Sequence, residues 1–185
     1  MTSISIKNMV CSHCVMMVRD LLTQCGLHPI EVTLGTATLA EDIETDQLKD
    51  IANRLYAIGF ALLDDPKAQL VEKIRTSVIQ WVHEEEPRKK LSDYLCDKTH
   101  KDYSALSKLF SEVRGITIER YCIGQRIEYA KELISYNELS ISEVAYKLGY
   151  SSPAQLSTQF KQVTGMTPKM FRFNHHNKRI NIDEI

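Results

Sequence analysis

The chain has 185 residues, of which 43% are hydrophobic and 25% charged, and its formal net charge is −1. This length suits two modest domains. No stretch reaches the roughly 20 apolar residues that a membrane helix needs, and the N-terminus lacks the pattern of a signal peptide. We therefore expect a cytoplasmic protein without a membrane span. Five cysteines, an odd number in a reducing compartment, argue against a disulfide framework.

The charge is unevenly distributed along the chain. Residues 1–65 hold four Lys/Arg and nine Asp/Glu, a balance of −5, which leaves +4 for residues 66–185. The second part is therefore the better candidate for binding a polyanion. Charge alone decides little, however, because many solvated surfaces carry an excess of this size.

Residues 1–65 show the order strand, helix, strand, strand, helix, strand. Apolar residues alternate with polar ones in the strands, a turn at Gly35 separates the two halves of a hairpin, and a second helix starts near Thr45. The last strand is expected at residues 60–63. The alternating apolar positions are Ile4, Ile6, Ile30, Val32, Leu34, Ala37 and Leu39. This order predicts a two-layer ferredoxin-like domain with the βαββαβ arrangement. Such a domain followed by a helical one gives an α+β protein.

A cysteine pair stands where the first strand meets the first helix, in the stretch Met9-Val-Cys11-Ser-His-Cys14. A helix N-terminus favours the thiolate form of cysteine, which is the form that binds metal. The stretch resembles the M-x-C-x-x-C motif of heavy-metal-associated domains, although that family has Gly where this chain has Asn8. The resemblance implies Cys11 and Cys14 as ligands of a soft ion such as Cu(I), and His13 as a further ligand that would suit Zn(II).

Three interpretations of the cysteine pair stay open: a metal sensor, a thiol redox switch, and a packing remnant on a fold reused as a dimer or partner module. The other cysteines and a histidine pair are interpreted as core, incidental or tail residues. They are Cys25, Cys96, Cys122, His175 and His176. The tail, residues 177–185, includes Lys178 and Arg179, which could touch phosphates.

A helical segment, residues 66–86, joins the two parts. Asp65 is its expected N-cap and Pro66 its first residue, and one apolar stripe runs from Leu70 to Val82, before an acidic run and Pro87 end the helix. We interpret it as the rigid first helix of the second domain. A hypothesis follows, that this helix transmits a change at the cysteine pair to the second domain.

The second domain, residues 87–176, contains a repeat. Residues 106–121 match residues 156–171 at a constant offset of 50. The paired residues are Leu106 and Leu156, Phe110 and Phe160, Val113 and Val163, Gly115 and Gly165, Thr117 and Thr167, and Tyr121 and Phe171. The first three pairs form the buried stripe of a helix, Gly ends that helix, and Thr caps the next one.

A short helix precedes each repeated one. Downstream, Ser140 and Glu143 form a capping box, and Ser152 with Pro153 starts the second helix after a tight turn. Upstream, residues 91–95 and 103–113 form the pair, with weaker caps. Two helices joined this closely make a helix-turn-helix. The stretch 139–172 resembles the second helix-turn-helix of AraC/XylS-family regulators, which implies a tandem, homeodomain-like domain whose two units are joined by the helix at residues 118–136.

Opposite its buried stripe, a recognition helix presents the residues that read bases in the major groove. We expect such contacts from Ser104, Ser107, Lys108, Ala154, Gln155, Ser157, Thr158 and Lys161. Gln155 could bond adenine bidentately, Ala154 or the Thr158 methyl could touch a thymine methyl, and Lys108 could address guanine or a phosphate.

These features predict a sequence-specific transcriptional regulator that binds double-stranded promoter DNA. RNA polymerase is an expected partner if the regulator activates, and pairing with a second copy of the chain as a homodimer is a further hypothesis. The alternative is a metal carrier whose helical half serves only for interaction. An enzyme is not expected, because the sequence offers neither a Ser-His-Asp set nor a carboxylate pair nor a phosphate loop.

Overall fold

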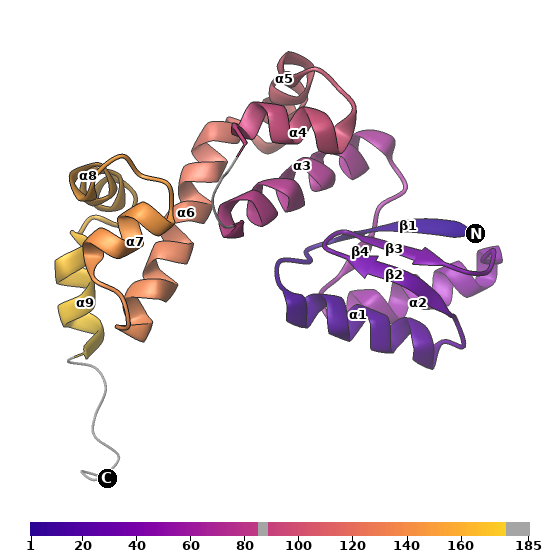
Figure 1. Cartoon of the computed structure of the whole chain (residues 1–185). Helices are drawn as coiled ribbons and strands as arrows, with labels where there is room; N and C mark the ends of the chain where they lie inside the picture. The colour runs from indigo at the N-terminus through magenta and orange to yellow at the C-terminus, as the bar shows by residue number, and fades with distance from the viewer. Residues whose placement is uncertain (85–88, 177–185) are drawn as a thin grey trace, which may run out of the picture.

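The computed structural model describes residues 1–84 and 89–176. A small sheet with two helices forms the N-terminal part, and an array of helices follows it (Figure 1). The predictions for Glu85, Glu86 and Pro87 and for the tail from residue 177, with Lys178 and Arg179, lie outside the described residues, as do the side chains of His175 and His176. No helix in the described ranges is long and apolar enough to cross a lipid bilayer.

The N-terminal part consists of β1 (Thr2–Lys7), α1 (Ser12–Gln24), β2 (Pro29–Thr33), β3 (Thr36–Leu39), α2 (Thr45–Ala57) and β4 (Ala61–Leu62). The sheet has the order β2-β3-β1-β4, and all neighbouring strands are antiparallel. Helices α1 and α2 cover one face, and the other face is turned toward α3 (Figure 1). The predicted order of elements is therefore confirmed.

The core of this part lies between the sheet and α1 and α2. Ile6, Ala37 and Leu39 are fully buried there against Leu22 and Leu55. Two expectations for the strands were wrong. Ile30 is 52% exposed, because the register of β2 against β3 shifts between Pro29 and Glu31 and moves Ile30 out of the alternation. The last strand is also shorter than predicted, with two residues.

The helical part consists of α3 (Pro66–His83), α4 (Leu91–Thr99), α5 (Tyr103–Arg114), α6 (Ile118–Tyr136), α7 (Ile141–Lys147), α8 (Pro153–Thr164) and α9 (Pro168–His176). The start of α3 is as predicted, since the Asp65 carboxylate accepts a hydrogen bond of 2.8 Å from the Ala68 amide. The apolar stripe of α3 packs with α4 and α5 in one core, and α7 and α8 enclose another.

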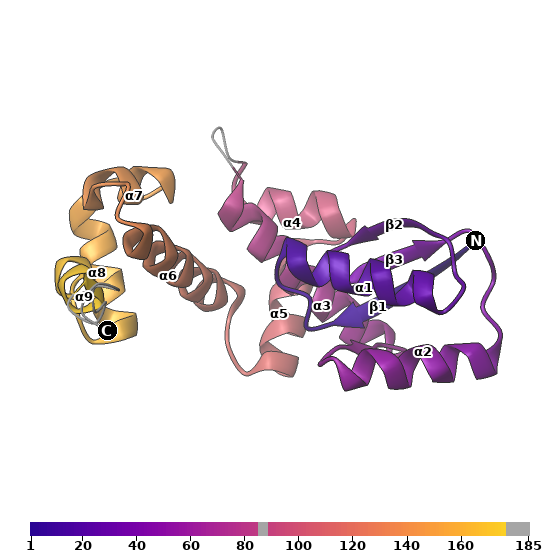
Figure 2. The same cartoon turned by 90° about the horizontal axis from the view of Figure 1, so that it is seen from below.

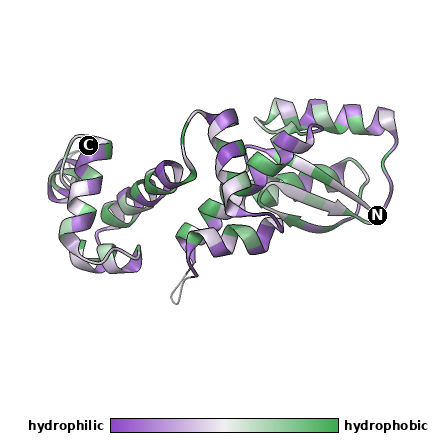
Figure 3. Ribbon diagram, turned by 90° about the horizontal axis from the view of Figure 1, so that it is seen from above, coloured by the Kyte–Doolittle hydropathy of each residue, from purple (hydrophilic) through white to green (hydrophobic). Residues whose placement is uncertain are grey.

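Helix α6 belongs to both cores, which makes it the structural link between the two helix-turn-helix units (Figure 2). Its first turns contribute Ile118 and Cys122 to the first core, and its later turns contribute Ile127, Ala130 and Ile134 to the second. When coloured by hydropathy, the helices carry apolar and polar residues on different faces, as amphipathic packing around two small cores requires (Figure 3).

Candidate nucleic-acid interface

The second unit, α7 and α8, has the predicted caps. The Ser140 hydroxyl accepts a hydrogen bond from the Glu143 amide at 3.2 Å, and the Glu143 carboxylate accepts one from the Ser140 amide at 2.7 Å. Ser152 caps α8, because its hydroxyl accepts a hydrogen bond from the backbone amide of Gln155, and Pro153 occupies the first helical position. Gly165 ends α8 at φ +80°, in the left-handed region.

The first unit, α4 and α5, repeats this plan with fewer caps. Asp102 precedes α5 without a hydrogen bond from its side chain, whereas Gly115 ends α5 at φ +69°. After each glycine a threonine caps the next helix, since Thr117 accepts from the Arg120 amide and Thr167 from the Met170 amide. Both α5 and α8 have 12 residues. The predicted duplication is confirmed.

The predicted buried stripe of the repeat was partly wrong. Leu106, Leu156, Phe110 and Phe160 are fully buried, but Val113 and Val163 are 52% and 49% exposed. The reason is that an aromatic ring of the next helix closes each core at that end. Tyr121 lies 5.6 Å from Phe110 between ring centroids, and Phe171 lies 5.5 Å from Phe160. The valines in the last turn therefore extend past the core.

Most predicted reading residues lie on exposed faces of α5 and α8. The exposed ones are Ser104, Lys108, Ala154, Gln155, Thr158 and Lys161. Ser107 and Ser157 are half-buried rather than solvent-facing, so they lie at the edge of the exposed face of each helix. Ala105 and Glu112 are also exposed on α5, and the offset of 50 pairs them with Gln155 and Gln162 of α8.

Gln155 is held by the turn that precedes α8. Its Oε1 accepts hydrogen bonds from the Ser151 amide at 3.0 Å and from the Ser151 hydroxyl at 2.9 Å. The bidentate adenine contact needs both ends of the amide, so in this arrangement only Nε2 can donate to a base. The Thr158 hydroxyl donates to the Ala154 carbonyl at 3.0 Å, which leaves its methyl group for an apolar contact.

The two units are joined by stacked side chains as well as by α6. The Arg126 guanidinium of α6 lies 4.8 Å from the ring centroid of Trp81 on α3 and 5.5 Å from that of Tyr150, which follows α7. In addition, the His83 and Tyr129 rings stack at 4.1 Å. A cation between two aromatic rings in a partly buried setting restrains their separation. This contact was not predicted, because the three residues share no local pattern.

The predicted metal residues lie at the start of α1. Cys11 and Cys14 have their sulfur atoms 3.5 Å apart, and hydrogen bonds from the Cys14 backbone and then its thiol lower the pKa of Cys11. His13 is exposed, and no three His, Cys, Asp or Glu side chains converge on a metal-sized site anywhere in the described ranges. The structure therefore brings together two of the three proposed ligands.

The loop before the cysteines contacts α3 directly. The Glu72 carboxylate accepts a hydrogen bond from the backbone amide of Asn8 at 3.1 Å, and the Arg75 guanidinium donates one to the Met9 carbonyl at 3.2 Å. Glu72 and Arg75 pair at 2.7 Å with side chains only 6% and 12% exposed. Burial alone would lower the pKa of Arg75, but its bond to Glu72 prevails and raises it. Asn8 has φ +77°, a backbone conformation that glycine adopts without strain, and glycine is the residue at this position in the heavy-metal-associated domains that the cysteine stretch resembles.

Cys11 also borders the helical part from another side. Together with Ile79 and His83 of α3 and Glu132 of α6 it lines a cavity of 460 Å³. The cysteine loop thus lies beside α3 and α6, the two helices that position the reading units, while Cys11 itself stays exposed. Glu72 and Arg75 were missed by sequence analysis, since they lie 64 to 66 residues from their backbone partners.

Comparison with known proteins agrees with this geometry. Residues 95–174 match a protein family described as a helix-turn-helix domain. An uncharacterized HTH-type transcriptional regulator of Staphylococcus aureus is 31% identical over 120 residues, which are 64% of this chain and 15% of that protein. The chain therefore corresponds to a small fraction of the length of this curated relative.

Two solved structures share the fold of the helical part. The DNA-binding domain of AdpA, a global transcriptional factor in complex with a target DNA, has a TM-score of 0.50 at 23% identity, covering 63% of this chain and 97% of that one. A transcriptional regulator of Chromobacterium violaceum with an AraC-type DNA-binding domain has a TM-score of 0.50 at 19% identity, covering 57% and 95%. Both establish the fold of this part.

Proposed function

Residues 95–174 form a helix-turn-helix domain with the AraC-type fold, and from this premise we propose that the chain is a sequence-specific DNA-binding transcriptional regulator of the AraC/XylS type. The observation that carries the proposal is the pair of matched helices α5 and α8, each with a buried leucine and phenylalanine and an exposed polar face. The relatives reported above are named as transcriptional regulators rather than enzymes.

In the proposed complex, α5 and α8 enter successive major grooves on one face of promoter DNA. The side-chain amide of Gln155 donates to a base, and the Ala154 and Thr158 methyl groups contact thymine. Lys161 lies near the sugar-phosphate backbone of the DNA. In the first unit Lys108 supplies the positive charge, whereas Ser104 and Ala105 offer small side chains. Helix α8 accordingly sets more of the base preference than α5.

A footprint on a selected operator is expected to show two protected segments, centred roughly 10 bp apart on one face of the duplex. The spacing follows because one rigid helix, α6, carries both units. Hydroxyl-radical footprinting of the purified chain measures it, and random DNA of equal length is the control. One short protected segment would contradict the two-unit proposal.

Replacement of Gln155 by alanine is expected to lower the preference for one base position by about 1 kcal/mol, roughly fivefold, since a full bidentate contact contributes about 1–3 kcal/mol. Affinity for operators already changed at that position should fall less. Binding to a library of single-base operator variants measures this profile.

Gln162→Ala is the matched control, because Gln162 is an exposed glutamine two turns further along α8. It should weaken all operators alike. An equal loss on every operator for Gln155→Ala would instead assign Gln155 to the DNA backbone.

For the N-terminal part we propose a ferredoxin-like domain of the heavy-metal-associated type, supported by the strand order β2-β3-β1-β4 and by the position of the cysteine pair. Two thiols 3.5 Å apart fit a soft ion such as Cu(I), and the lowered pKa of Cys11 favours its thiolate. A bound ion would supply a charge change at this loop. Thiol oxidation of the same pair is the second candidate signal.

The location and partners follow from the proposed activity. We propose that the protein acts in the cytoplasm, where bacterial promoter DNA lies. Binding to RNA polymerase and pairing with a second copy stay predictions. Transfer of the signal from the cysteine pair would run through Glu72 and Arg75, because these residues join the cysteine loop to α3.

A further inference from the structure

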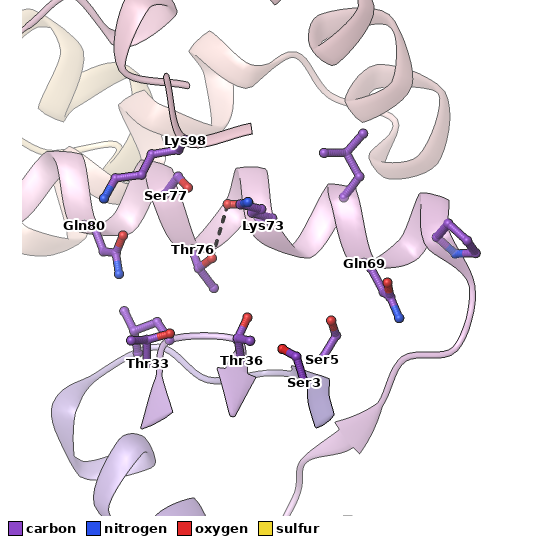
Figure 4. A pocket seen from close by; sticks show the side chains of 14 residues that line it. Ser3, Ser5, Thr33, Thr36, Gln69, Lys73, Thr76, Ser77, Gln80 and Lys98 are labelled. Carbon is purple, nitrogen blue, oxygen red and sulfur yellow. Dashed lines mark hydrogen bonds between the residues drawn. The ribbon is translucent and has the colours of Figure 1, made fainter. Parts of the chain in front are cut away.

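A cavity of 480 Å³ separates the uncovered face of the sheet from α3 (Figure 4). This volume lies within the range of about 300–1,000 Å³ that small-molecule sites occupy. The cavity is distinct from the reading faces of α5 and α8, and neither Cys11 nor Cys14 lines it. It lies between the two parts of the chain, so that a molecule bound there would touch both.

The sheet contributes a floor of hydroxyl groups. Because side chains alternate between the faces of a strand, burial of Ile4 and Ile6 turns Ser3 and Ser5 of β1 toward the cavity. Thr36 of β3 pairs with Ser5 and lines the cavity beside it. Each hydroxyl can both donate and accept a hydrogen bond, as the hydroxyl groups of a ligand also can.

The opposite wall is a polar stripe of α3. Gln69, Thr76 and Gln80 point from α3 toward the strands (Figure 4). These positions lie on the side of α3 away from the apolar stripe that packs against α4 and α5. Hydrogen-bonding groups therefore lie on both walls, beside the apolar side chains of Leu34, Pro66 and Leu70, and a wholly apolar ligand would leave these groups without partners.

The charge of the lining is one-sided. Lys73 of α3 and Lys98 of α4 line the cavity, and no acidic residue does. Neither lysine forms an ion pair with any residue in the described ranges. This contrasts with the surplus of acidic residues in the adjoining N-terminal part. Two ammonium groups without carboxylate partners are suited to carboxylate or phosphate.

Contacts between the sheet and α3 restrict the space in the cavity. A Cβ atom added at Gly35 would lie 3.1 Å from Cγ2 of Thr76, which lies between Gln80 and Gln69 along α3 (Figure 4). Near Pro66, the Gln69 side chain donates to the Leu63 carbonyl at 2.6 Å, which ties α3 to the chain leaving the sheet.

We propose that this cavity binds a small organic anion that carries several hydroxyl groups. Lys73 and Lys98 hold the anionic group, and the Ser5, Thr36 and Gln69 side chains bind the hydroxyl groups. A neutral polyol would leave the lysines without a counter-charge, and an apolar acid would leave the hydroxyl floor without partners. A sugar acid and a sugar phosphate share the required chemistry.

Three probes with a similar six-carbon polyol chain distinguish a sugar acid from a sugar phosphate as the ligand. They are glucitol, gluconate and glucitol 6-phosphate. Isothermal titration calorimetry of the full chain, without DNA, should show binding of at least one of the two anions at least tenfold tighter than binding of glucitol. A preference for gluconate would identify a carboxylate ligand, and a preference for the phosphate a phosphorylated one.

Lys73→Gln and Lys98→Gln should each weaken the better anion about tenfold, the effect of losing a charge-assisted hydrogen bond. Lys67→Gln is the matched control, because Lys67 is exposed on the first turn of α3 and does not line the cavity. It should leave affinity unchanged. Thermal unfolding of each variant, with an unchanged midpoint, shows that the fold is intact.

Equal affinity for glucitol and for both anions would overturn the proposal, as would the lack of detectable binding of either anion at millimolar concentration. An equal loss in the Lys67 variant and the Lys73 variant would show attraction by general charge only, and would also overturn it. A role of the ligand as effector rests on the proposed function. Because the titration contains no DNA, a failure of DNA binding leaves its outcome interpretable.

Discussion

Replacing Phe160 by alanine is expected to destabilise the second helix-turn-helix unit by about 3–5 kcal/mol, the usual effect of truncating a fully buried phenylalanine. Phe160 is 0% exposed and packs against Phe171 in the second core. That core is joined to the first one only by α6 and by the contacts of Arg126 with Trp81 and Tyr150, as far as the described residues show. The loss should therefore appear as local opening of α7 to α9 rather than as unfolding of the whole chain.

Hydrogen exchange read by mass spectrometry measures this prediction. Protection should fall in α7, α8 and α9 and stay near its original level in α4 and α5. The matched control is Val163→Ala, since Val163 lies three residues further along α8 but is 49% exposed, so its truncation should change stability by less than about 0.5 kcal/mol. A uniform loss of protection along the chain would show that the two cores unfold as one unit.

Replacing Arg75 by methionine is expected to cost about 3–5 kcal/mol, because it leaves the Glu72 carboxylate buried without its counter-charge. The same change removes the donor to the Met9 carbonyl, so the cysteine loop keeps only its bond from the Asn8 backbone amide to Glu72 and should open from α3 more often. Urea denaturation gives the free energy of unfolding, and proteolysis under native conditions reports the opening of the loop.

The double variant Glu72→Met, Arg75→Met completes the test. Apolar replacement of a whole buried pair is often close to neutral, so the double variant should be more stable than Arg75→Met alone. Additive losses would mean that the two side chains do not act as a pair. Arg54→Met is the exposed control, since its ion pair with Asp50 is about half exposed and contributes little.

Local patterns in the sequence predicted the helices and their ends well. The capping box at Ser140 and the glycine at each helix end specify backbone geometry within a few residues, and the offset of 50 then related the first unit, which has weaker caps, to the second. The βαββαβ order of the N-terminal part was predicted in the same way, from the alternation of apolar residues.

The errors arose where a local pattern meets a tertiary contact. Val113 and Val163 follow the helical period, but burial depends on which neighbour reaches them, and Tyr121 and Phe171 close the cores instead. Ile30 follows the strand period until a register shift interrupts it. Gln155 lies on the predicted face, yet its carbonyl oxygen is occupied by Ser151.

Contacts between the two parts of the chain could not be predicted from sequence at all. Glu72 and Arg75 look like an ordinary surface pair at a spacing of three residues, and only the fold shows that they are buried against the Asn8 and Met9 backbone. The cavity between Ser5 and Gln69 likewise joins residues that no spacing connects.

The stacking of Arg126 between Trp81 and Tyr150 has an optical consequence. Trp81 is the single tryptophan of the chain, so intrinsic emission excited near 295 nm originates from one position, at the joint between the two helix-turn-helix units. Its indole N–H donates to the Lys89 carbonyl at 2.9 Å, which also ties it to the start of the first unit. The protein thus contains its own fluorophore at the place where a change in the angle between the units would alter the surroundings of the indole ring, including its distance from the Arg126 guanidinium.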